Sequence, residues 1–140
     1  MRVIDITTVA SPTDCAWAAG IIDGEGHIGV FTYKTTISLK IVVQMTSPLV
    51  PTRLHELFGG FLGGPYYRGQ STRKGVWHWS VSGNEMRRIL PMICPYMVEK
   101  LAKVELAKEF VATRASMPTT WRSPEQNSLL RGFKERMRVV

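Results

Sequence analysis

Two acidic residues alternate with two glycines in Asp23-Gly24-Glu25-Gly26, and these are the residues with the clearest potential for chemistry. Residues 12–23 are predicted to form a helix, because Ser11-Pro12-Thr13-Asp14 offers an N-cap, a first-turn proline and an acid for a capping box. The glycines would end this helix with the left-handed geometry of a C-terminal cap. Glu25 would then lie just past the negative end of the helix dipole, where a carboxylate is repelled. A divalent cation reverses that repulsion, since carboxylate and main-chain carbonyl oxygens suit Mg²⁺, whereas a solvated turn is the alternative.

The same predicted helix carries a stripe of small side chains at helical spacing, formed by Ala16, Ala19, Gly20 and Asp23. Such a stripe lets a second helix approach closely. The bulkier residues of the helix are expected to face the core, and these are Trp17, Ile21 and Ile22.

Alternation of apolar and polar residues predicts two pairs of strands, at 27–34 with 37–45 and at 65–71 with 75–82. Helices are expected at 51–58, 85–93, 95–113 and 124–139. The resulting order of elements is that of an α+β protein. We expect one domain over residues 1–140, with a core at about 12–113 followed by a C-terminal loop and basic helix at 114–140.

The charge of the chain indicates a polyanionic partner. Eighteen Lys and Arg against eleven Asp and Glu give a net charge of +7, and the pI is about 9.8. Residues 27–84, which include both predicted strand pairs, hold Glu56 as their only acid. Nucleic acid is therefore the first candidate, and a solvated basic face is the alternative.

Membranes and disulfide frameworks find no support in the sequence. The longest apolar run falls short of the roughly 20 residues that a membrane-spanning helix needs. Cys15 and Cys94 lie alone in apolar surroundings, and the three histidines share no metal-ligand spacing. We expect an intracellular protein of the cytoplasm, the nucleoid or an organelle.

Residues 18–26, Ala-Ala-Gly-Ile-Ile-Asp-Gly-Glu-Gly, resemble the motif that names the LAGLIDADG homing endonucleases, with Ala for the first Leu, Gly for the second Ala and Glu for the second Asp. The order of elements, the strand end Trp79-Ser80-Val81-Ser82-Gly83, and Pro95-Tyr96 leading to Lys100 are similar to the same family. The resemblance covers about residues 12–113. It implies an αββαββα fold in which helices cover one face of a curved antiparallel sheet and the other face enters the major groove of DNA.

The resemblance also implies the roles of individual residues. Glu25 would bind the catalytic Mg²⁺ or Mn²⁺, and Gly24 would add a main-chain carbonyl to that metal site. Lys100 matches the basic residue that lies near the scissile phosphate, and Gln44 falls near a polar residue at the end of the second strand. Asp23 is expected to be a structural acid at the helix end and not a metal ligand. Solvated side chains are the alternatives for Lys100 and Gln44.

The activity implied is a metal-dependent double-strand cut at a long, nearly palindromic DNA site. A two-carboxylate centre needs two copies of a motif that occurs once here, so we expect a homodimer whose interface is Ala16, Ala19, Gly20 and Asp23. The residues expected to contact DNA are Tyr33, Lys34, Ser38, Lys40, Arg68, Gln70, Arg73, Lys74, His78 and Ser80.

Without intein splicing residues, the chain is expected to be free-standing and encoded in a mobile intron. The alternatives are a catalytically inactive DNA-binding protein, an intron-splicing RNA cofactor (maturase), and a basic scaffold that recruits RNA without specificity.

Overall fold

The computed structural model describes residues 10–67 and 74–140, and these residues form an α+β fold. The elements follow in the order α1 (Pro12–Glu25), β1 (Gly26–Tyr33), β2 (Thr36–Met45), α2 (Leu49–Phe58), β3 (Phe61–Tyr66), β4 (Val76–Ser82), α3 (Asn84–Ile93), a 3₁₀ turn (Cys94–Tyr96), α4 (Leu101–Ala115) and α5 (Pro124–Arg138). The strands form one antiparallel sheet in the order β1-β2-β4-β3. The predicted αββαββα order and the antiparallel sheet are therefore confirmed.

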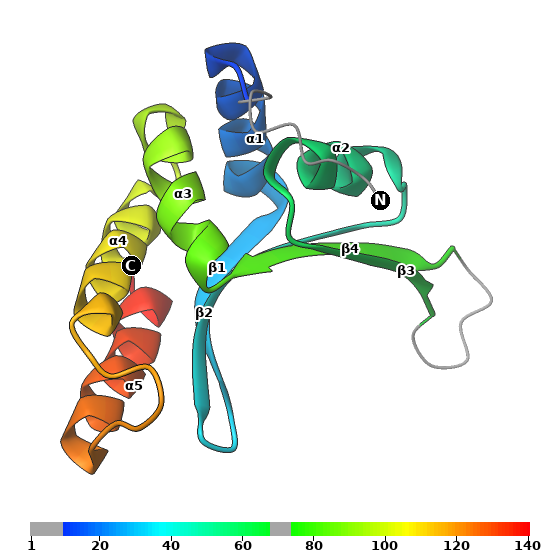
Figure 1. Ribbon diagram of the computed structural model, residues 1–140. Coiled ribbons are helices and arrows are strands. Elements are labelled where there is room, and N and C mark those ends of the chain that lie inside the picture. Colours follow the sequence, from blue (N-terminus) through cyan, green and yellow to red (C-terminus); the bar gives the residue numbers. More distant parts are fainter. Residues whose placement is uncertain (1–9, 68–73) are drawn as a thin grey trace, which may run out of the picture.

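The helices of the described residues lie on one side of the curved sheet, and the other side is open (Figure 1). Alternation along the strands explains this division, because successive side chains point to opposite faces. Ile28 and Val30 of β1 are buried on the helical side, as are Leu39, Ile41 and Val43 of β2. The register places Ile28 opposite Ile41 and Val43 opposite Trp79, so the central strands share one apolar layer. The predicted core faces of β1, β2 and β4 are confirmed.

Helix α1 begins as its sequence predicts and ends differently. The Ser11 hydroxyl accepts from the Asp14 amide at 3.1 Å and the Asp14 carboxylate accepts from the Ser11 amide at 3.0 Å, which completes the capping box. At the other end the helix continues through Glu25, and Gly26 at its C-terminus has an extended φ of −89°. The prediction of a left-handed glycine cap with Glu25 beyond the helix was wrong, because Gly26 enters strand β1 directly and its backbone follows that strand.

Two predicted faces of α1 need correction. Ala19 is fully buried in the core of its own chain, together with Ala18 and Ile22, and does not belong to an exposed stripe. Trp17 was predicted to face the core but is 36% exposed. Helix α1 packs on α3 and on strands β1 and β2, and Ala19 lies in the core cluster to which these elements contribute.

The strand β3 begins earlier than predicted. It covers Phe61–Tyr66 and includes Gly63 and Gly64, which were expected to precede a strand at 65–71. Residues 68–71 of that predicted strand lie outside the described residues. Close approach to β4 explains the glycines, since a Cβ on Gly64 would lie 2.8 Å from the Val76 carbonyl oxygen. A pairing irregularity between Gly63 and Tyr66 accommodates the proline.

The last two predicted helices have different outcomes. Residues 95–113 do not form one helix, because the 3₁₀ turn ends at Tyr96 and α4 begins only at Leu101. The helix α5 is confirmed and packs on β1 and α4 through Leu130, Phe133 and Met137. Phe133 meets Phe110 of α4 edge to face, with ring centroids 5.4 Å apart. Within residues 10–67 and 74–140 no helix has the length and apolar character to cross a membrane.

Candidate catalytic centre and nucleic-acid interface

The C-terminal end of α1 brings together the acid and the base that the sequence singled out. Glu25 is exposed in the last turn, and no hydrogen bond or ion pair within the described residues engages its carboxylate. The same turn contains no basic residue of its own. Instead the Lys100 ammonium, from the start of α4, donates to the Asp23 carbonyl oxygen at 2.5 Å. A cation at a helix C-terminus is favourable because the free carbonyls there carry partial negative charge.

Asp23 serves as a structural acid, as predicted. Its carboxylate accepts hydrogen bonds from the backbone amides of Val98 at 2.8 Å and Lys100 at 3.0 Å. These bonds satisfy the Asp23 carboxylate within the chain, so Glu25 is the acid of the motif that is left for another ligand.

The donors at this helix end fit one half of a divalent metal site. Glu25 and Gly24 are both exposed and supply the hard oxygen atoms that Mg²⁺ prefers. Across the described ranges, however, no group of three or more His, Cys, Asp or Glu residues could hold a metal ion. One copy of the chain thus offers a single carboxylate, and the metal prediction depends on a second source of ligands.

Gln44 lies on the open face of the sheet beside His78. The two residues are directly opposite in the β2–β4 pairing, and the Gln44 Nε2 lies 2.9 Å from the His78 Nδ1. An amide nitrogen only donates, so His78 accepts at Nδ1 and carries its proton on Nε2. Burial, and after it the positive charge of Lys40, lowers the pKa of His78, which agrees with a neutral ring. A catalytic role for Gln44 stays a prediction.

The open face carries five of the seven described residues that were predicted to contact DNA. Tyr33, Ser38, Lys40, His78 and Ser80 all alternate with the buried core positions of their strands. Lys34 lies in the turn between β1 and β2, and exposed Lys74 lies just before β4. Arg68, Gln70 and Arg73 lie outside the described residues.

Three further side chains of this face were not selected from the sequence. The Lys40 ammonium lies 5.6 Å from the centre of the Phe31 ring, and His27 meets the same ring edge to face. Phe61 of β3 packs against the edge of His78. Phe31 and His27 share the alternation of Tyr33, so the same pattern could have found them.

The exposed surface of α1 is the predicted dimer interface. Ala16 and Gly20 are exposed, Asp23 is half-buried, and Trp17 borders them, whereas Ala19 is inaccessible. A Cβ added at Gly20 would meet no atom within 4 Å, so the described residues leave this surface uncovered.

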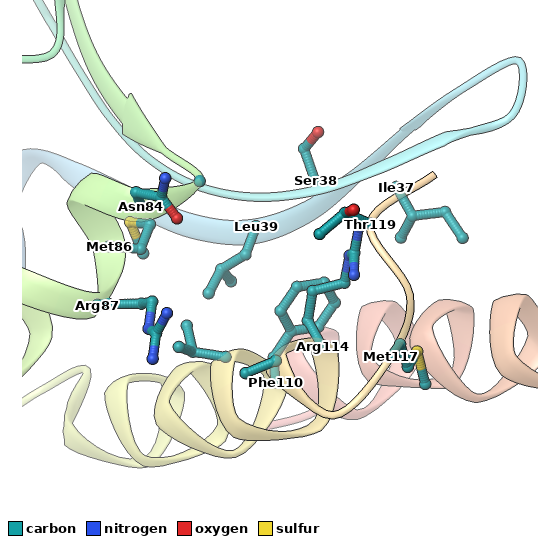
Figure 2. Close-up of a pocket in the computed structure, with 13 residues that line it drawn as sticks. Ile37, Ser38, Leu39, Asn84, Met86, Arg87, Phe110, Arg114, Met117 and Thr119 are labelled. Carbon is teal, nitrogen blue, oxygen red and sulfur yellow. The ribbon is translucent and has the colours of Figure 1, made fainter. Parts of the chain in front are cut away.

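A cavity of about 410 Å³ lies elsewhere, between β2, α3 and α4. Figure 2 shows Leu39, Met86 and Phe110 lining it, with Arg87 and Arg114 beside them. Burial, followed by the charge of Arg122, lowers the pKa of Arg114. This cavity is on the helical side of the sheet, and of the residues predicted for catalysis or DNA binding its lining includes only Ser38.

Comparison with solved structures identifies the fold. The homing endonuclease I-CvuI bound to its target matches with a TM-score of 0.74 and 16% identity, over 91% of this chain and 82% of that chain. The LAGLIDADG homing endonuclease I-GzeII in complex with its DNA target matches with a TM-score of 0.68 and 17% identity, over 96% of this chain and 46% of that one. I-SmaMI bound to uncleaved DNA with calcium gives a TM-score of 0.68 and 15% identity, over 98% and 48%. No model of a protein family and no curated protein matches the sequence.

The chain has the fold of the LAGLIDADG homing endonucleases. The resemblance drawn from residues 18–26 is thereby confirmed for the fold. The chain spans most of I-CvuI but less than half of I-GzeII and I-SmaMI, which is consistent with a chain that carries one motif.

Proposed function

We propose that this protein is a sequence-specific DNA endonuclease that requires a divalent metal and acts as a homodimer. The observation that carries the proposal is the end of α1, where Glu25 is exposed and the Lys100 ammonium binds the carbonyl of the same helical turn. Hydrolysis of a phosphodiester can use both groups, because an available carboxylate can bind a metal ion and a cation held nearby can stabilise the negative charge of the phosphate.

In this proposal Glu25 and the Gly24 carbonyl hold Mg²⁺ or Mn²⁺. The metal, when bound, supplies an activated water and positive charge for the leaving oxygen. Lys100 faces the scissile phosphate and offsets its negative charge. Asp23 contributes no oxygen to the metal, because its carboxylate already accepts from two backbone amides and its carbonyl from Lys100.

The open face of the sheet is the proposed DNA surface. Its strands carry hydrogen-bonding side chains at alternate positions, including Ser38, Lys40, Gln44, His78 and Ser80. A two-stranded ribbon fits the major groove, where base edges present distinct donor and acceptor patterns. I-CvuI, I-GzeII and I-SmaMI, which share the fold, are each found in complex with DNA.

A homodimer follows from the number of carboxylates. Each chain offers one Glu25 at the uncovered surface of α1, so a second copy packed on Ala16 and Gly20 would bring a second carboxylate to the same centre. A two-fold dimer requires two equivalent half-sites, and the DNA target is therefore expected to be nearly palindromic.

The test is to incubate the protein with Mg²⁺ and a randomised duplex library and to sequence the cut ends. Cut sites with two related half-sites are expected. A protein that binds a defined duplex yet leaves it intact across Mg²⁺ and Mn²⁺ titrations would contradict the endonuclease proposal and favour an inactive DNA-binding protein or an RNA cofactor.

Glu25→Gln keeps the size of the side chain and removes its charge. Cleavage of the selected duplex is expected to fall by several orders of magnitude, because the metal loses its carboxylate ligand. Binding is expected to persist, and to tighten without divalent ions, because two carboxylates near the phosphates repel the DNA. Single-turnover cleavage and fluorescence anisotropy measure the two effects. Glu125→Gln, at an exposed position in the first turn of α5, is the matched control and should cut normally.

A further inference from the structure

Asp23 accepts hydrogen bonds from both the backbone amide and the side-chain ammonium of Lys100. The Lys100 backbone amide donates to the Asp23 carboxylate at 3.0 Å, and the Lys100 ammonium donates to the Asp23 carbonyl at 2.5 Å. The second carboxylate oxygen accepts from the Val98 amide at 2.8 Å. Two segments 77 residues apart in the sequence are therefore fastened by one acidic residue.

This contact also explains the break before α4. Met97 is extended with ψ of 144°, and Lys100 at the N-cap of α4 has φ of −104° and ψ of 21°. The side chain of Lys100 makes no capping bond, and the first turn of α4 contains no acid. The Asp23 carboxylate, from another helix, instead accepts the amides of Val98 and Lys100, which lie in the segment just before α4.

Holding a lysine at a fixed point has an entropic cost. Its side chain carries about 2 kcal/mol of rotamer entropy, and an exposed ammonium usually samples many positions. Here the backbone and the ammonium of Lys100 are bound to one residue, which lies two positions before Glu25. The position of the Lys100 ammonium relative to the helical turn that contains the proposed metal ligand is thus set by Asp23.

We propose that Asp23 is a positioning residue that holds the Lys100 ammonium at the catalytic end of α1. This inference rests on the proposed endonuclease function. It assigns Asp23 an effect on the reaction that passes through Lys100, in addition to its contribution to stability.

The first test is a double-mutant cycle with Asp23→Asn and Lys100→Met. An asparagine oxygen can accept one of the two amides, but its NH₂ group faces the other donor. Asp23→Asn is expected to slow single-turnover cleavage by about 10- to 100-fold at saturating DNA, the scale of a misplaced group, and to change the DNA Kd much less. In a Lys100→Met background the same substitution should slow cleavage no further. Equal slowing in both backgrounds would overturn the proposal.

A matched control separates an effect of Asp23→Asn on stability from its effect on the position of Lys100. Asp14→Asn removes a carboxylate at the opposite end of α1 that also accepts a backbone amide, from Ser11 at 3.0 Å, and that does not contact Lys100. This variant should cut normally at a temperature where both variants are folded, as judged by circular dichroism. If the two variants lose cleavage equally, the effect of Asp23 is structural only.

The second test does not depend on cleavage. Lys100 is expected to react more slowly with an amine-acylating reagent than exposed Lys108 in the wild-type protein, and this difference should shrink in Asp23→Asn. Mass spectrometry of peptides measures both rates. If the wild-type protein cuts no duplex, the endonuclease proposal fails while this measurement still tests the positioning. Unchanged acylation of Lys100 in Asp23→Asn would overturn the positioning itself.

Discussion

His78 shows how one side chain on the open face combines geometry with charge. Its Nδ1 accepts from Gln44, its edge meets Phe61, and burial followed by Lys40 lowers its pKa. The neutral form therefore predominates at neutral pH, and the ring presents an Nε2–H donor beside the Gln44 amide. Because the Gln44 and His78 side chains already hold each other in place, binding to a base edge would cost them little conformational entropy.

The lowered pKa leads to a prediction about DNA affinity and pH. Because the folded-state pKa of His78 is below its ordinary value of about 6.5, the ring gains positive charge only as the pH falls below that value. Affinity at constant salt should therefore be nearly constant from about pH 8 to 7 and rise as the pH falls below about 6.5. Fluorescence anisotropy with wild type and His78→Gln measures the change. An equally steep rise in the variant would assign it to another group.

Acidification is expected to lower the stability of the folded protein while it raises the affinity for DNA. The unfolded chain protonates His78 at a higher pH than the folded chain does, so acidification below about pH 6.5 destabilises the fold. Binding measurements are therefore compared at pH values where circular dichroism shows the protein to be folded.

At the scale of elements, α5 completes the helical layer. The sequence left open whether this basic helix binds DNA or packs on its own chain. The structure places its apolar side on β1 and α4, on the side of the sheet opposite the open face (Figure 1). Lys134 also donates to Thr32 of β1 at 3.2 Å, which ties the helix to the hairpin.

Two neighbouring leucines of α5 test this packing. Leu130 is fully buried and Leu129 is 54% exposed. Leu130→Ala is expected to lower the free energy of unfolding by about 2–5 kcal/mol, because it leaves a cavity in the core. Leu129→Ala should change it by less than about 0.5 kcal/mol. Urea unfolding followed by circular dichroism measures both, and similar losses would show that α5 is not docked as described.

At the scale of the whole molecule, the proposed homodimer depends on the exposed surface of α1. Among the residues that the structure describes, nothing lies within 4 Å of a Cβ built at Gly20, so a larger residue fits the monomer there. In a dimer packed through this helix it would collide with the partner. Fold and association can therefore be changed separately.

Gly20→Leu is expected to weaken the dimer by about 1–3 kcal/mol, or about ten- to a hundredfold in Kd, because the two helices can no longer approach closely. Sedimentation at micromolar concentration measures the change, and cleavage should fall with it. Gly132→Leu is the control, since Gly132 in α5 is also exposed with open space at its Cβ. Unchanged sedimentation and cleavage of Gly20→Leu would show that the interface lies elsewhere.

The sequence alone determined the features that depend on neighbours in the chain. Ser11 and Asp14 start α1 through a local capping box, and alternation in β1 and β2 separates a core face from an open face. The order of elements and the motif at residues 18–26 were enough to predict the fold. Each of these signals involves residues within a few positions of one another, so their physics is readable without a tertiary structure.

The tertiary structure decided what depends on distant partners. Ala19 is buried and Trp17 is exposed, which is the reverse of the sequence prediction, because α1 packs on α3 and the sheet through the side that carries Ala19. The glycines at 63 and 64 became part of a strand because β4 lies close enough to exclude a Cβ at Gly64. The helix predicted from Pro95 is interrupted between Tyr96 and Leu101, where the Asp23 carboxylate, 77 residues before Lys100 in the sequence, accepts the amides of Val98 and Lys100. Local periodicity contains no information about such contacts, and it is such a contact that holds the Lys100 ammonium at the C-terminal end of α1.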